Sequence, residues 1–192
     1  MKKAIGIIVG FLVCAVVIGA VWAYSLWKNP IVAQIDQTMD GYLIREDGSM
    51  EPCQVTLSGV SRHFRVQDAA SPDNFEGQIS FNGNYVKAYI EYYDGREYGF
   101  WSYLENVYGV EGSDTKHSHF ILGKEMDFVT VECWLDADGK MTAQDAGTPA
   151  LLLAPAPGEA DIPGLLAQMG EIMEEFPALS EDYHCEWWNL AC

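Results

Sequence analysis

The chain has 192 residues, of which 28 are Asp or Glu and 11 are Lys or Arg, so its formal net charge at pH 7 is −17. Binding to nucleic acid or to anionic lipid head groups depends on Lys and Arg displacing counterions from phosphates, and this charge opposes it. The composition therefore excludes nucleic acid as a partner and leaves cations, a basic protein or a carbohydrate.

The N-terminal segment Ala4 to Trp27 is a run of 24 residues without a charge. As a helix rising about 1.5 Å per residue it would extend about 36 Å, slightly more than the roughly 30 Å hydrocarbon core of a bilayer. Lys2 and Lys3 precede the run, and acidic residues dominate after it, which places the N-terminus in the cytoplasm. The sequence predicts a cytoplasmic stub and a single transmembrane helix over residues 1–28.

A cleaved secretory signal is the alternative interpretation, with Val21, Trp22 and Ala23 near the cleavage point. Signal peptides usually have an apolar region of about 7 to 15 residues, and this one is longer, which favours a retained anchor. The preferred localisation is a single-pass protein of the cell membrane, and the alternative is a secreted protein. In both cases the chain after Lys28, with eight basic and 28 acidic residues and hence a formal charge of −20, is exported.

Residues 29–40 favour a short juxtamembrane stalk helix. Pro30 suits the first turn of a helix, and Ile31, Ile35 and Met39 recur every four residues. From Gly41 the apolar period changes from four to two, so a β-domain is expected over residues 41–154.

Turn signals divide this β-domain into short strands. Asp47-Gly48, Asn82-Gly83 and Asp94-Gly95 are typical of tight hairpin turns, and the last two predict a three-stranded meander over residues 79–104. Residues 117–122 and 127–135 are expected to pair, and 150–154 is a last apolar strand. The fold class predicted is mainly β, an antiparallel β-sandwich or small barrel of about eight strands.

The C-terminal part begins with a Pro-rich linker over residues 155–160. An amphipathic helix is predicted over residues 161–177, with Asp161 as its cap and apolar residues on one face. It is expected to dock on an open face of the sheet, and the alternative is a free surface for a partner. Residues 178–192 form a tail.

Four cysteines belong to the exported part, and an even number in an oxidising compartment permits two disulfides. Cys53 and Cys133 each lie in step with the apolar residues of a predicted strand, so both should point into a core. The preferred pairing joins Cys53 to Cys133 and Cys185 to Cys192. Buried free thiols are the alternative, because cysteine packs as a small apolar side chain.

Two histidines on one predicted strand form a candidate metal site. His117 and His119 flank a single residue, so both imidazoles project from one face, as two ligands of a zinc-like metal would. His63, His184 and Glu132 are candidates for a third ligand. The alternative is a pair of solvated histidines at the start of a strand.

Aromatic residues recur on two predicted strands. Tyr85, Tyr89 and Tyr93 share one face of the first, and Trp101 and Tyr103 share one face of the next. Exposed aromatic faces stack on sugar rings or cover a partner protein. The alternative is that these residues are present because aromatic side chains suit a pleated sheet.

These features favour a membrane-anchored extracytoplasmic β-domain with a non-catalytic binding or scaffolding role at the cell envelope. No nucleophile, base and orienting group assemble in the sequence, and no cofactor is predicted. An exported metal-dependent hydrolase that uses His117 and His119 is one alternative. A carbohydrate-binding surface module is the other.

Overall fold

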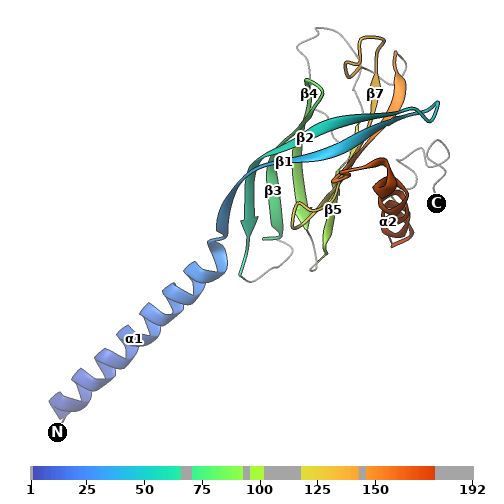
Figure 1. Cartoon of the computed structure of the whole chain (residues 1–192). Coiled ribbons are helices and arrows are strands. Elements are labelled where there is room, and N and C mark those ends of the chain that lie inside the picture. Colours follow the sequence, from blue (N-terminus) through green and yellow to red (C-terminus); the bar gives the residue numbers. More distant parts are fainter. Residues whose placement is uncertain (1, 66–70, 93–95, 102–117, 143–145, 176–192) are drawn as a thin grey trace.

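The computed structural model describes residues 2–65, 71–92, 96–101, 118–142 and 146–175 (Figure 1). Their main elements are an N-terminal helix, α1 (Lys2–Lys28), eight strands, and a helix near the C-terminus, α2 (Ile162–Glu175). The strands are β1 (Ile31–Arg45), β2 (Met50–His63), β3 (Asp73–Phe81), β4 (Asn84–Tyr92), β5 (Tyr98–Trp101), β6 (His119–Gly123), β7 (Val129–Leu135) and β8 (Thr148–Ala154).

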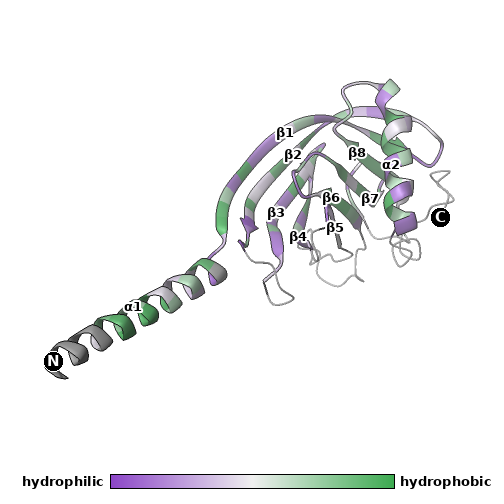
Figure 2. Cartoon of the chain, turned by 90° about the horizontal axis from the view of Figure 1, so that it is seen from below, coloured by the Kyte–Doolittle hydropathy of each residue, from purple (hydrophilic) through white to green (hydrophobic). Residues whose placement is uncertain are grey.

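Helix α1 projects away from the β-domain (Figures 1 and 2). Every residue from Gly10 to Ser25 is exposed, including large apolar ones such as Phe11 (75% exposed) and Ile18 (68%). Within the described residues, no helix combines the length and the apolarity needed to cross a membrane.

The eight strands form one antiparallel sheet that curls into a nearly closed barrel, in the order β4-β3-β2-β1-β8-β7-β6-β5. Its two edge strands, β4 and β5, approach each other where the barrel closes. Gly99 of β5 lies against the side chains of Ile90 and Tyr92 of β4, with no room for a Cβ. The Tyr92 hydroxyl donates a hydrogen bond to the carbonyl oxygen of Gly123 at 3.4 Å, which ties β4 to the end of β6.

The predicted stalk helix over residues 29–40 is wrong, because β1 already begins at Ile31. Residues four apart lie on one face of a helix, but they also lie on one face of a strand, so Ile31, Ile35 and Met39 fit both periods. The pairing of β1 with β2 decides in favour of a strand. β1 runs antiparallel to β2 from Ile31 opposite His63 to Ile44 opposite Met50, and this ladder outweighs the local helical preference.

Two of the predicted hairpin turns are confirmed. Gly48 adopts a φ of +78° between β1 and β2, and Asn82 and Gly83 have φ values of +45° and +72° between β3 and β4. Positive φ at both central residues matches the twist of the flanking strands. The meander over residues 79–104 is wrong in its last step, because β5 pairs with β6 and not with β4. The Asp94-Gly95 turn lies outside the described residues.

Apolar side chains form two cores, one on each side of the sheet. The interior of the barrel is filled by large side chains such as Phe75, Phe81 and Phe120, all at most 2% exposed. The outer core lies between α2 and the sheet. It contains Ile44, Ile121, Phe128, Leu151, Leu153, Ile162, Met169, Ile172 and Met173. The expected docking of the amphipathic helix on the sheet is confirmed (Figure 2).

Candidate functional site

A cluster of polar side chains lies on the inward face of β2 and β3. Ser61 and His63 are two residues apart on β2 and therefore project to the same side. The Ser61 hydroxyl lies 3.2 Å from His63 Nε2, and His63 Nδ1 lies 3.2 Å from Asp73 Oδ2. Lys124, from the turn between β6 and β7, places its ammonium 2.6 Å from the same Asp73 oxygen.

Asp73 is the centre of this cluster, and its side chain is only 4% exposed. Its other oxygen, Oδ1, accepts a hydrogen bond from the backbone N–H of Phe64 at 2.6 Å. Burial alone would raise the pKa of Asp73, but the hydrogen bonds from Lys124, the Phe64 amide and His63 outweigh it and hold the pKa below its ordinary value of 3.8. The carboxylate is therefore charged at neutral pH and joins β3 to the β6–β7 turn.

The order of hydroxyl, imidazole and carboxylate is that of a serine nucleophile with its base and orienting acid. Two features argue for a structural role instead. Ser61 is only 3% exposed. The Lys124 ammonium already neutralises the Asp73 oxygen that would have to stabilise an imidazolium. The cluster therefore holds this end of the barrel together.

Sequence reasoning missed this cluster. It treated His63 only as a possible third metal ligand. The signal available was the alternation of β2, which puts Ser61 and His63 on the same face as Val55 and Leu57. Asp73 and Lys124 could not have been added, because they reach the cluster through strand pairing and through barrel closure.

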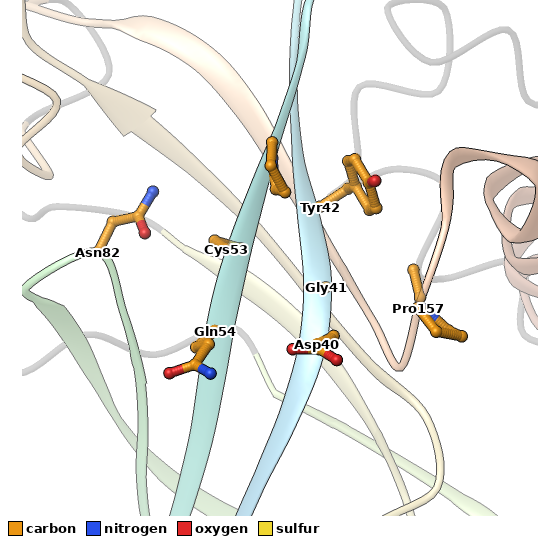
Figure 3. A pocket seen from close by; sticks show the side chains of 9 residues that line it. Asp40, Gly41, Tyr42, Cys53, Gln54, Asn82 and Pro157 are labelled. Carbon is orange, nitrogen blue, oxygen red and sulfur yellow. The ribbon is translucent and has the colours of Figure 1, made fainter.

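A shallow groove of about 440 Å³ lies along the outer side of the β1–β2 hairpin (Figure 3). Asp40 of β1 and Gln54 of β2 face each other across the strand pair, with Pro157 on one side and Asn82 on the other. The groove is lined by Asp40, Gly41, Tyr42, Pro52, Cys53, Gln54, Asn82, Ala156 and Pro157. Carboxylate and amide groups next to proline and tyrosine rings can both hydrogen-bond and pack against a ligand.

The structure places His119 on β6, directly opposite Glu132 on β7. Both are buried, at 8% and 0% exposure. His63 lies on β2, which β1, β8 and β7 separate from β6 in the sheet. Among the described residues, no three His, Cys, Asp or Glu side chains lie close enough together to hold a metal ion. His117 and His184 lie outside those residues. Of the proposed metal ligands that are described, the structure brings only His119 and Glu132 next to each other.

The candidate aromatic surface is described in part. Tyr85 and Tyr89 lie on the outward face of β4, where Tyr89 is 42% exposed and donates a hydrogen bond to Glu91 at 2.8 Å. Tyr93 and Tyr103 lie outside the described residues, and of Trp101 only the backbone in β5 is described. β4 and β5 are the two edge strands, so the tyrosines and Trp101 do not lie on hydrogen-bonded neighbours.

The preferred pairing of Cys53 with Cys133 is wrong, since both are free thiols in the structure. Both point into the core, as their phase predicted. Cys53 lies on β2 and Cys133 on β7, with β1 and β8 between them. Strands about 4.8 Å apart put these positions roughly 14 Å apart across the sheet, far beyond the reach of a disulfide. Cys185 and Cys192 lie outside the described residues.

Comparison with protein-family models, with curated proteins and with solved structures gives no match to this chain.

Proposed function

We propose that the protein is a non-catalytic β-domain that α1 holds at the outer face of a cell membrane, where it binds or scaffolds another component of the envelope. The observation that carries the proposal is the exposure of α1. Its apolar side chains from Gly10 to Ser25 lie in solvent on every side, whereas the β-domain buries most of its own. Such a surface gains free energy when it leaves water.

The outer surface of the barrel supports a binding role. Large apolar side chains fill the interior, whereas the groove beside the β1–β2 hairpin is open and carries polar groups. Among the described residues, Ser61, His63 and Asp73 resemble a nucleophilic site, but the hydroxyl and the carboxylate are buried and Lys124 neutralises the carboxylate. A surface that recognises a partner therefore fits the described residues better than a catalytic centre does.

The membrane part is tested with the full-length chain expressed in a bacterial host. Wild-type protein should stay with the membranes after a carbonate wash, and protease added to spheroplasts should digest the β-domain. Changing both Val13 and Val17 to Arg should release the protein, because each Arg costs about 2.5–3.5 kcal/mol at the centre of a membrane helix. Changing both to Leu is the matched control. Soluble wild-type protein, or a protease-protected β-domain, would contradict the proposal.

The binding part is tested by photo-crosslinking. A photoreactive residue at Gln54, in the groove, should capture an envelope component in intact cells. The same residue at Lys87, which is exposed on β4, is the control and should not capture it. Equal capture at both positions would rule out the groove as a recognition surface.

A further inference from the structure

Strand β1 is paired on one side along nearly its whole length but on the other side only near its end. β2 pairs with it from Ile31 to Ile44, whereas β8 pairs only with Tyr42 to Arg45. One further contact follows, in which the Ala156 N–H donates to the Asp40 carbonyl oxygen at 2.8 Å. Among the described residues, no strand borders Ile31 to Met39 on that side.

The backbone groups on this open edge can be identified. In an antiparallel ladder alternate residues direct both N–H and C=O to the same neighbour. The Asp40 carbonyl points to the β8 side, so the even-numbered residues of β1 share its direction. Four of them lie along the open edge and are exposed: Val32, Gln34, Asp36 and Thr38. Their N–H and C=O groups form a template for one more strand.

This edge lacks lysine, proline and bulges, three of the features by which proteins usually protect an exposed strand. Lysine, proline and bulges prevent edge pairing, and the sequence from Ile31 to Met39 has neither Lys nor Pro. Its register with β2 runs without interruption, so it has no bulge either. An edge left in this state is suited to bind an extended segment.

The charge of the edge selects the occupant. Asp36 and Asp40 project from it, and no Lys or Arg occurs between Ile31 and Ile44. A strand added there would place its side chains beside these carboxylates, where opposite charges attract. The groove that contains Asp40 continues the same surface.

A second copy of this chain fits the edge poorly. Two identical edges related by a two-fold axis pair antiparallel, which would send the two α1 helices in opposite directions. Helices anchored in one membrane must enter it from the same side.

We propose that the open edge of β1 binds an extended, basic segment of a partner protein by strand addition. The inference rests on the proposed function, because it names the class of partner that the tethered domain recognises. Backbone hydrogen bonds from Val32, Gln34, Asp36 and Thr38 would supply the pairing, and Asp36 and Asp40 the preference for Lys and Arg.

The probe is a labelled nine-residue peptide in which Thr alternates with Lys, titrated against the full-length chain in a neutral detergent and followed by anisotropy. Binding should weaken as salt is raised, since the attraction is between exposed charges. A peptide with Glu in place of Lys should bind at least about tenfold more weakly. A Thr-Lys peptide N-methylated at every residue should not bind, because it has no backbone N–H to donate to the edge.

Asp36→Pro tests the edge from the protein side. It removes an N–H that the ladder with β2 does not use, so the fold should survive, while peptide affinity falls at least about tenfold. Asp36→Asn should reduce affinity by up to about fivefold through charge alone.

Equal binding of the N-methylated peptide, or of the Glu peptide, would overturn the proposal without relying on a variant. A dimer that Asp36→Pro dissociates would overturn it in favour of a second copy. Membrane retention of α1 is measured separately, so failure here leaves that result intact.

Discussion

At the scale of single residues, the nearly buried Asp73 carboxylate joins three separate parts of the chain. It accepts from Lys124, from His63 and from the backbone of Phe64 while nearly buried. A buried carboxylate stabilises a fold only while its partners are present, and removing one leaves a desolvated charge. The cluster therefore matters for stability more than its small size suggests.

We expect Lys124→Met to lower the free energy of unfolding at pH 7 by about 1–3 kcal/mol, because the Asp73 carboxylate loses its ammonium partner. The pKa of Asp73 is lower in the folded state than in the unfolded chain. Its stabilisation is therefore present above the ordinary pKa of 3.8 and is lost as pH falls through the lower folded-state pKa. Urea unfolding at several pH values measures this.

Asp73→Asn is the control for the pH dependence. It should destabilise the protein at pH 7 and flatten the loss of stability that follows when pH falls below the ordinary carboxyl pKa of 3.8, because the amide does not titrate. If this variant loses as much stability at low pH as the wild type does, that loss comes from other carboxylates.

The two core thiols should be inert in the folded protein. Burial, together with the nearby charge of Glu51, raises the pKa of Cys53 to about 11, and burial raises the pKa of Cys133 further. Because the thiolate is the reactive form, iodoacetamide at pH 8 should label neither. After unfolding without a reductant, both should react, as read by peptide mass spectrometry.

Gln54→Cys provides a positive control, since this exposed neighbour of Cys53 should be labelled in the folded state. A non-reduced peptide pair that links Cys53 to Cys133 would show that the thiols are paired after all.

At the scale of elements, β1 and the seam between β4 and β5 decide the architecture. β1 joins the two halves of the sheet, β2 to β4 on one side and β5 to β8 on the other. Among the described residues, the seam closes by side-chain contact across Gly99 and not by a ladder of paired residues. Close packing of this kind tolerates little added volume.

Two Gly→Ala changes test the seam and α2 in opposite directions. Gly99→Ala should cost about 1–3 kcal/mol, because the new methyl group overlaps Ile90. Gly170→Ala should stabilise by about 0.5–1 kcal/mol, since nothing lies near its added Cβ and Ala favours the helix. Chemical denaturation compares both variants with the wild type. A stable Gly99→Ala protein would mean that the seam is looser than its contacts indicate.

Local chemistry made several elements readable from the sequence. Asn82-Gly83 and Asp47-Gly48 accept positive φ, so their hairpins follow from residue type. The face of α2 with Met169, Ile172 and Met173 follows from helical spacing and is the buried face. The predicted stalk helix was wrong because residues four apart in the sequence share one face of a strand as well as one face of a helix.

At the scale of the whole molecule, the net charge of −17 acts on the folded state as self-repulsion. Ion pairs such as Arg45 with Glu51 and Arg62 with Glu76 offset it, but each of these two has an exposed carboxylate. Exposed pairs contribute little to stability. The barrel and its docked helix must therefore supply most of the stability.

Added salt should stabilise the protein at pH 7. Raising NaCl from about 0.01 M to 0.3 M shortens the Debye length from roughly 30 Å to under 10 Å and screens the repulsion. The free energy of unfolding should rise by about 1 kcal/mol. Urea titrations at both concentrations measure it, with KCl as a check against ion-specific effects. A decrease with salt would mean that the attractive pairs dominate.

The sequence by itself determined the acidic charge, the apolar N-terminal segment, the hairpin turns and the amphipathic face of α2, because each depends on residues close together in the chain. Only the tertiary structure decided that residues 31–40 extend a strand, that β5 pairs with β6, that Cys53 and Cys133 stay apart, and that Lys124 meets Asp73. These outcomes depend on which distant strands become neighbours. Strand pairing is set by the packing of the whole sheet, and no local pattern encodes it.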